Sequence, residues 1–149
     1  MGLLDKPRGI SRKRKLAKTY STRKVTKNRD FISSFEFAWT GLVSAFKDER
    51  NMKKHMAVAA LVLIFGFLFQ LDYYEWLIII ICVFLVFIVE MLNTVAENIV
   101  DLVTDGHWYE LAKVAKDVAA GAVLLTSLMA AIVGVIIFGR HFLMLIGWF

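Results

Sequence analysis

The sequence is poor in cysteine and proline, the residues that most often crosslink or interrupt small soluble domains. Its 149 residues include one of each. A single cysteine excludes an intramolecular disulfide and a cysteine-based metal site, so we expect Cys82, inside an apolar run, to serve packing. The chain also lacks a GxxxxGK[ST] phosphate loop and the protein-kinase motifs. A soluble kinase fold is therefore excluded.

Acidic residues are scarce near the N-terminus, where basic residues are concentrated. Residues 1–30 hold eleven of the 18 Lys and Arg and only two acidic residues. We expect a disordered cytoplasmic tail held near anionic lipid by its charge. No aromatic stacking platform accompanies the charge, so nucleic-acid binding is the weaker interpretation and no nucleic-acid partner is predicted. A secretory signal is not expected, because the first long apolar run begins only near residue 56.

Apolar residues, in contrast, are abundant, at 58% of the chain. Three segments are long and apolar enough to cross a bilayer as helices, which takes about 20 apolar residues. No strand-like alternation or internal repeat is found, and a helix satisfies its backbone polar groups internally. We predict an all-α membrane domain over 31–149, with spans at about 54–71, 73–98 and 118–139.

The basic residues beside the spans predict their orientation, because Lys and Arg favour the cytoplasmic side. The basic tail and the segment "ERNMKKH" precede the first span, whereas the following connection, "LDYYE", contains neither Lys nor Arg. The second connection, residues 101–117, carries Lys113 and Lys116. We therefore expect the N-terminus and the second connection in the cytoplasm and the C-terminus outside.

Residues 31–50 precede the first span and have apolar side chains at nearly helical spacing. The pattern predicts an amphipathic helix lying on the cytoplasmic face of the membrane, with Trp39 as an anchor at the interface. The alternative, a core helix of a small soluble cap, is less favoured because little chain remains to build such a cap.

The second span carries an unusual row of polar residues in its second half. At 100° per residue, these side chains fall within about 80° of one another on one helix face. Such a face either joins helices through hydrogen bonds or forms a functional site, and three carboxylates at membrane depth favour a site. The polar face consists of Glu90, Asn93, Glu97 and Asp101.

Depth suggests a role for each carboxylate. Glu90 lies about 25 Å into a hydrocarbon layer of roughly 30 Å, which suits a general base acting on the hydroxyl of a lipid. Glu97 is about 10 Å nearer the water and cannot share one metal ion with Glu90. Glu49, at the junction before the first span, is the expected partner of Glu97. Such a pair suits Mg²⁺ that is also bound by substrate phosphates.

Lys116 and Asp117 stand where we expect the third span to begin. Asp117 is explained by helix capping, since a carboxylate interacts well with a helix N-terminus. Lys116 is unfavourable there unless an anion lies opposite. A polyphosphate fits, because helix N-termini and Lys both bind phosphate.

Taken together, these motifs resemble a known family. The match runs from about residue 35 to residue 139 and includes "AWTGL" and "ERNMKKH". The polar face, followed by Lys116-Asp117 and "VAAGAV", resembles the prokaryotic integral-membrane diacylglycerol kinase and undecaprenol kinase family. The segments "ERNMKKH" and "AKDVAAGAV" are closer to its Gram-positive, undecaprenol kinase branch.

The resemblance implies a homotrimeric helical bundle in the bacterial cell membrane, with active sites at the cytoplasmic interface between subunits. It also implies a general base at Glu90, metal and nucleotide binding by Glu49 and Glu97, and support from Asn93. Lys116 and Asp117 are then nucleotide-site residues, with Asp101 in the same polar region.

We therefore expect a lipid kinase that uses MgATP, with undecaprenol as the preferred acceptor. One alternative is diacylglycerol as the main acceptor, giving phosphatidic acid. A second alternative belongs to another class, a non-catalytic membrane oligomer whose carboxylates line an ion path or join helices.

Overall fold

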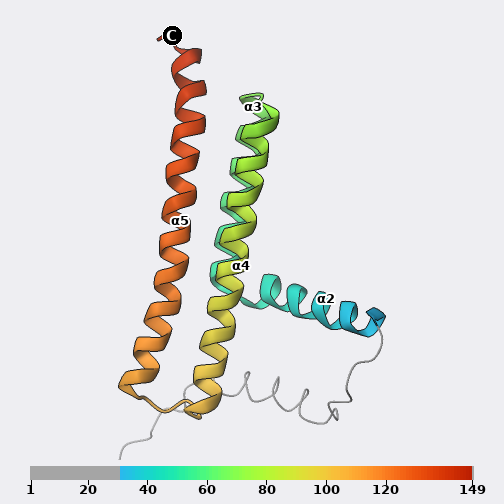
Figure 1. The fold of residues 1–149 in the computed structure, drawn as a ribbon, viewed down its shortest axis with the longest axis vertical. Helices are drawn as coiled ribbons and strands as arrows, with labels where there is room; N and C mark the ends of the chain where they lie inside the picture. The colour runs from blue at the N-terminus through green and yellow to red at the C-terminus, as the bar shows by residue number, and fades with distance from the viewer. Residues whose placement is uncertain (1–30, 149) are drawn as a thin grey trace, which may run out of the picture. The chain divides into compact units, whose positions relative to one another are not determined.

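The computed structural model describes residues 31–148, so the predicted basic tail lies outside the described residues. Four helices follow one another in this part of the chain, and it contains no strand (Figure 1). The all-helical prediction is thereby confirmed. The helices are α2 (Phe31–Asp48), α3 (Arg50–Leu68), α4 (Tyr73–Val103) and α5 (Glu110–Leu145).

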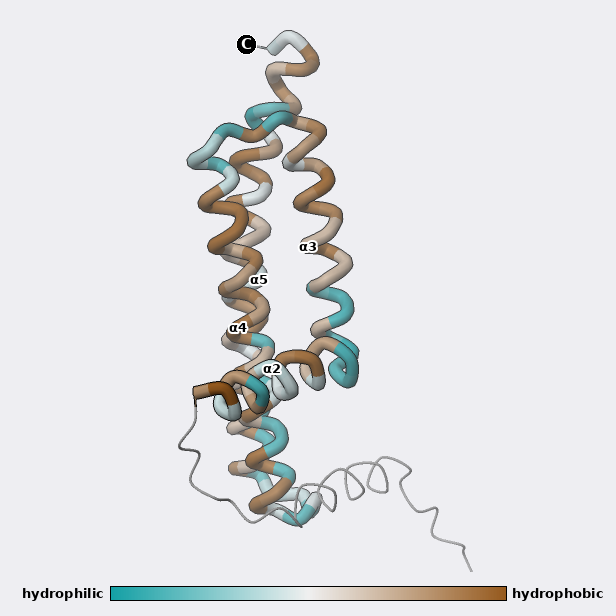
Figure 2. Tube along the Cα trace, turned by 90° about the vertical axis from the view of Figure 1, so that its right-hand side faces the viewer, coloured by the Kyte–Doolittle hydropathy of each residue, from teal (hydrophilic) through white to brown (hydrophobic). Residues whose placement is uncertain are grey.

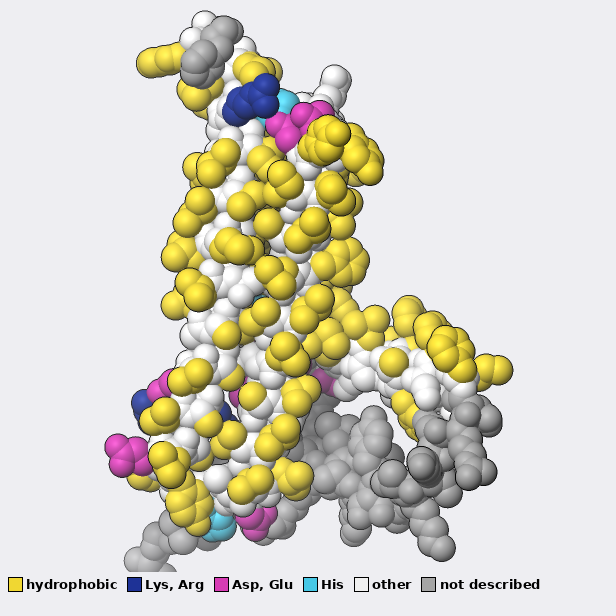
Figure 3. Space-filling model, in the orientation of Figure 1, with side chains coloured by type: hydrophobic (Ala, Val, Ile, Leu, Met, Phe, Trp, Pro, Cys, Tyr) yellow, Lys and Arg dark blue, Asp and Glu magenta, His cyan; other side chains and the backbone are white. Residues whose placement is uncertain are grey.

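Three of these helices, α3, α4 and α5, are long and apolar enough to cross a membrane, as the sequence predicts. α4 has 31 residues and is about 46 Å long, which exceeds a hydrocarbon layer of roughly 30 Å. Hydrophobic residues accordingly predominate in the middle of α3, α4 and α5 (Figure 2). On the face seen in Figure 3, charged side chains gather toward the two ends of the bundle. The chain is a multi-pass membrane protein.

α2 forms over the range predicted for the amphipathic helix. None of its residues is buried, and the Trp39 side chain is 58% exposed. An exposed indole remains accessible to a membrane interface, so the predicted anchoring role of Trp39 stays open to test.

The turn between α3 and α4 is built from local interactions that fix the start of α4. Asp72 is the N-cap residue, and its side chain accepts hydrogen bonds from the backbone of Tyr74 and Glu75. Glu75 completes the capping box, because its carboxylate accepts a hydrogen bond from the backbone N–H of Asp72 at 3.0 Å. Such caps satisfy backbone donors that would otherwise lack partners at the helix end.

Glu75 also joins the start of α4 to the end of α5. The Nε2 atom of His141 lies 2.9 Å from one oxygen of the buried Glu75 carboxylate. The guanidinium group of Arg140 lies 3.7 Å from the other oxygen. In the same region Ile79 packs with Ile137 in the hydrophobic core. These contacts establish that α4 and α5 run antiparallel along each other.

We expect His141→Ala to lower the free energy of unfolding in detergent by roughly 1–2 kcal/mol, because the half-buried Glu75–His141 hydrogen bond is lost. The midpoint of thermal unfolding, followed by circular dichroism, measures the effect. Arg140→Ala is the matched control. Its pair with Glu75 is longer and Arg140 is 63% exposed, so a smaller decrease is expected. An Arg140→Ala effect equal to that of His141→Ala would contradict this ranking.

α5 begins earlier than the sequence predicts. Its first residue is Glu110 and its N-cap is Tyr109, so Lys116 and Asp117 lie within the helix rather than at its N-terminus. The expectation that Asp117 caps the helix, and that Lys116 stands at a helix N-terminus, is wrong. The physical reason is that "ELAKVAK" consists mostly of strong helix formers, which extend the helix beyond its apolar part.

Candidate functional site

The predicted polar face of α4 points partly into the protein. Glu90 is 2% exposed and Asn93 is 6% exposed, while Glu97 and Asp101 are half-buried. Within residues 31–148, Glu75 and Glu90 are the two buried charged residues, and they lie toward opposite ends of α4. A buried carboxylate is costly unless it is paired or used, so the surroundings of Glu90 are informative.

Groups from the beginning of α3 surround the Glu90 carboxylate. The Nε2 atom of His55 lies 3.8 Å from a Glu90 oxygen, and the Asn51 side chain forms a hydrogen bond with the carboxylate. The charges of Glu49 and Glu97 also act on it. The structure therefore brings Glu49, Glu90 and Glu97 into one polar region, although they come from two parts of the chain.

An aromatic contact helps to hold the α2–α3 junction beside α4. The ring of Phe46, in the last turn of α2, meets the ring of Phe87 edge-on, with 5.5 Å between centroids. Glu49 follows as the single non-helical residue between α2 and α3, with extended backbone angles. Its side chain makes no capping hydrogen bond, so the carboxylate is not used to stabilise the start of α3.

Asn93 links the buried and the more exposed parts of the polar face. Its Nδ2 atom donates a hydrogen bond to Oε1 of Glu97 at 3.1 Å, which orients that carboxylate. Its Oδ1 atom is buried and has no hydrogen-bond partner. Buried polar atoms are nearly always satisfied in proteins, so an unpartnered amide oxygen at this place marks a position for a ligand donor or a cation.

This donor set fits Mg²⁺ bound together with a nucleotide. No group of three or more His, Cys, Asp or Glu side chains that could hold a metal occurs between residues 31 and 148. Mg²⁺ does not require such a group, since one or two carboxylates and substrate phosphates commonly hold it. Glu49, Glu97 and the free oxygen of Asn93 are oxygen ligands of this kind.

Lys116 reaches the polar face from α5. Its ammonium group contacts Oδ1 of Asp101 in a partly buried ion pair. Asp117 lies one position further along and instead pairs with Lys113 at 2.7 Å, where both side chains are more than 60% exposed. Of the two residues of α5 predicted to bind nucleotide, Lys116 therefore contacts the polar face and Asp117 pairs within its own helix.

Some polar residues of this region are not assigned a role by the sequence pattern. His55 and Asn51 contact Glu90 from α3, and the Oγ atom of Ser127 on α5 is buried without a hydrogen-bond partner. The available signal is weak. His55 stands at the edge of an apolar run and Ser127 within one, and such a polar residue is usually explained by helix packing. Asn51 lies in a charged segment, where an amide side chain attracts no notice.

Comparison with known proteins gives the same family as the resemblance. The family described as prokaryotic diacylglycerol kinase matches residues 36–138. Undecaprenol kinase of Bacillus subtilis (strain 168) is 45% identical over 108 residues, which are 72% of this chain and 87% of that protein. Diacylglycerol kinase of Synechocystis sp. is 40% identical over 105 residues, 70% of this chain and 60% of that protein.

A more distant relative agrees with this assignment. Diacylglycerol kinase of Escherichia coli (strain K12) is 30% identical over 111 residues, 74% of this chain and 90% of that protein. The matched range contains every predicted site residue and ends before Arg140 and His141. Because these relatives are kinases, the non-catalytic alternative is set aside. The chain belongs to the prokaryotic diacylglycerol kinase family and is a lipid kinase.

Proposed function

We propose that the protein transfers the γ-phosphoryl group of ATP to the hydroxyl group of undecaprenol, giving undecaprenyl phosphate and ADP. The observation that carries the proposal is the nearly complete burial of Glu90, at 2% exposure, beside the charges of Glu49 and Glu97. The choice of acceptor rests on similarity, because the Bacillus subtilis undecaprenol kinase is 45% identical to this chain, against 40% and 30% for the two diacylglycerol kinases.

In this mechanism Glu90 accepts the proton of the lipid hydroxyl. The freed oxygen forms a bond to the γ-phosphorus, the bond between that phosphorus and the β–γ bridging oxygen breaks, and ADP leaves with the bridging oxygen. Little covalent chemistry is required of the protein in phosphoryl transfer, so positioning and charge stabilisation dominate. His55 and Asn51 hold the Glu90 carboxylate in place before the lipid arrives.

Glu49 and Glu97 are the proposed ligands of Mg²⁺, and Asn93 orients Glu97. Bound Mg²⁺ supplies charge neutralisation at the phosphate oxygens. Lys116 is the proposed partner of the nucleotide phosphates, with Asp101 holding its ammonium group in their absence. Asp117, which pairs with Lys113, is placed by the proposal at the edge of the nucleotide site.

The proposed assembly is a homotrimer with its active sites on the cytoplasmic side. Only 6% of the most apolar stretch of α5 is buried within one chain, so its apolar surface faces either lipid or a neighbouring subunit. The basic residues before α3 support a cytoplasmic N-terminus. In this arrangement α2 lies on the cytoplasmic surface and Trp39 rests at the interface.

The role of Lys116 is tested by comparison with Lys113, one helical turn away. We expect Lys116→Gln to raise the KM for ATP about tenfold or more, since a hydrogen bond to a charged group contributes roughly 1.5–3 kcal/mol. Lys113→Gln serves as the matched control and should leave the KM nearly unchanged, because its partner is the exposed Asp117. Equal effects of the two substitutions would rule out a specific role for Lys116.

The acceptor is tested by offering undecaprenol and diacylglycerol to the purified protein in mixed micelles with labelled ATP. We expect a higher kcat/KM for undecaprenol. A higher kcat/KM for diacylglycerol would instead make the protein a diacylglycerol kinase, like its Synechocystis and Escherichia coli relatives. Phosphorylation of neither lipid would refute the proposed function.

A further inference from the structure

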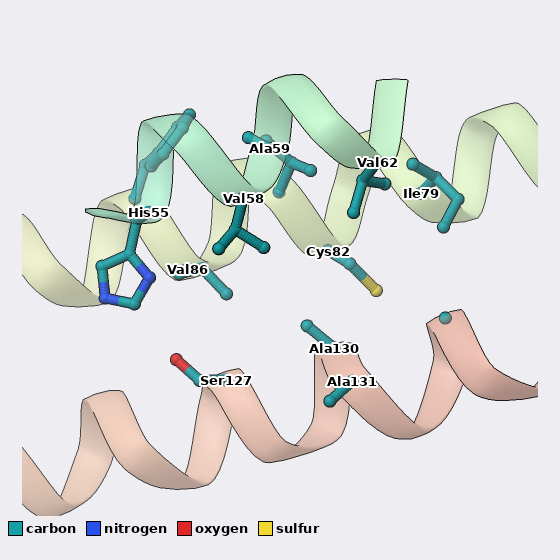
Figure 4. A pocket seen from close by; sticks show the side chains of 13 residues that line it. His55, Val58, Ala59, Val62, Ile79, Cys82, Val86, Ser127, Ala130 and Ala131 are labelled. Atoms are coloured by element: carbon teal, nitrogen blue, oxygen red, sulfur yellow. The ribbon is translucent and has the colours of Figure 1, made fainter. Parts of the chain in front are cut away.

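Helices α3, α4 and α5 of the single chain line a partly open pocket with a cavity volume of about 150 Å³. Figure 4 shows side chains of α3 and α4 on one side of it and side chains of α5 on the other. Small residues on the α5 side, Ala130, Ala131 and Gly134, leave this space open. We call it the interhelix pocket.

The polar groups of the interhelix pocket lie at one level of the bundle. His55 and Ser127 are its only lining residues whose side chains carry nitrogen or oxygen, and His55 lies 3.8 Å from Glu90. The pair Lys116–Asp101 fixes the register of α4 and α5. The same number of residues separates Ser127 from Lys116 as separates Glu90 from Asp101, so Ser127 lies at the level of Glu90 on the neighbouring helix.

The rest of the interhelix pocket is apolar and extends away from Glu90. It is lined by residues of α4 as far as Ile79, eleven positions before Glu90, or about 16 Å along the helix. The Oγ atom of Ser127 is buried and has no hydrogen-bond partner. A cavity with an unsatisfied hydroxyl group at one end and an apolar body suits a molecule with one hydroxyl group and one hydrocarbon chain.

We propose that the interhelix pocket binds the first isoprene unit of a prenol whose hydroxyl group is held between Ser127, His55 and Glu90. This inference rests on the proposed function and deepens it, because it names a structural source of selectivity for a prenol. An apolar cavity of about 150 Å³ accommodates a ligand of the size of benzene, which is close to one five-carbon isoprene unit. On this proposal the bulkier two-chain backbone of diacylglycerol fits the pocket less well than a prenol does.

Occupancy of the interhelix pocket can be measured without catalysis. Cys82 lines the pocket and is the only cysteine in the sequence, so its alkylation by N-ethylmaleimide reports on access. Without ATP, we expect farnesol in micelles to slow this alkylation at least about tenfold, and dioctanoylglycerol at the same mole fraction to have little effect. Mass spectrometry of the intact protein gives the rates.

A substitution within the interhelix pocket provides the second arm of the test. A Cβ atom added at Gly134 meets nothing within 4 Å, so the side chain of Gly134→Leu starts in open space. We expect it to abolish protection by farnesol and to raise the KM for prenol about tenfold or more, with the KM for ATP unchanged. Gly134→Ala, which fills less of the pocket, should have a smaller effect in the same direction.

The matched control is Gly139→Leu, also on α5 and with nothing within 4 Å of an added Cβ atom, but outside the interhelix pocket. It should preserve both protection and KM. Equal effects of the two leucine variants would overturn the inference, as would the absence of farnesol protection in the wild-type protein. If Cys82, which is 7% exposed, does not react in the lipid-free protein, the KM values of the two leucine variants decide the inference.

The outcomes also separate the inference from the proposed function. Prenol phosphorylation without protection of Cys82 would reject the interhelix pocket as the prenol site and leave the activity standing. Protection of Cys82 without phosphorylation of any lipid would reject the activity and leave the binding site standing.

Discussion

Replacing Glu90 by Gln is expected to lower kcat roughly 10²–10⁴-fold, the usual contribution of a general base, while nucleotide binding is largely retained. Gln preserves the size of the side chain and its hydrogen bond with Asn51 but cannot take the proton of the lipid hydroxyl. Lipid phosphorylation with labelled ATP gives kcat, and equilibrium binding of a fluorescent ATP analogue gives the affinity.

Glu75→Gln is the matched control for this prediction. Glu75 is also a buried carboxylate on α4, at 9% exposure, but it lies near the opposite end of the helix and pairs with His141. We expect Glu75→Gln to lower the thermal stability and to leave kcat within a few-fold of the wild type. Wild-type turnover in Glu90→Gln, or an equal loss in both variants, would reject Glu90 as the base.

Replacing Glu97 by Gln is expected to have the second large effect. Loss of a metal-ligating carboxylate removes several kcal/mol of transition-state stabilisation, or more than about a hundredfold in kcat/KM. We also expect a higher Mg²⁺ concentration to be needed for half-maximal activity. Titration of activity with Mg²⁺ at saturating ATP measures this shift.

Two further variants sharpen the assignment of Glu97. Glu49→Gln should shift the Mg²⁺ dependence in the same direction, because its charge acts in the same polar region. Glu110→Gln removes an exposed carboxylate from the first turn of α5 and should leave the Mg²⁺ dependence unchanged. A Mg²⁺ dependence in Glu97→Gln that equals the wild type would contradict the proposed metal ligand.

Much of the fold follows from local properties of the chain. The three apolar helices are predicted from hydropathy, since each apolar run reveals itself without reference to the others. The start of α5 is not predicted correctly, because "ELAKVAK" is helical without being apolar and hydropathy does not detect it. Helix propensity is the signal that extends α5 back to Glu110.

The candidate site was predictable in part. The helical period places Glu90, Asn93 and Glu97 on one face of α4, and the structure adds that this face is packed around Glu90 and Asn93. The contact of His55 with Glu90 and the pair of Lys116 with Asp101 were not predictable from spacing. Each of these contacts joins residues from different helices. Many polar residues stand at the edge of an apolar run, so spacing along one helix does not single out the residues that meet.

The sequence by itself determined that the chain has three apolar helices and that one of them carries carboxylates along a single face. Hydropathy and the helical period are properties of a continuous segment, so they can be read along the chain. The tertiary structure decided which groups surround Glu90, how Lys116 reaches Asp101, and where the interhelix pocket lies. These features depend on the antiparallel register of α4 and α5 and on side-chain packing between helices, and neither is encoded in the spacing of residues within one helix.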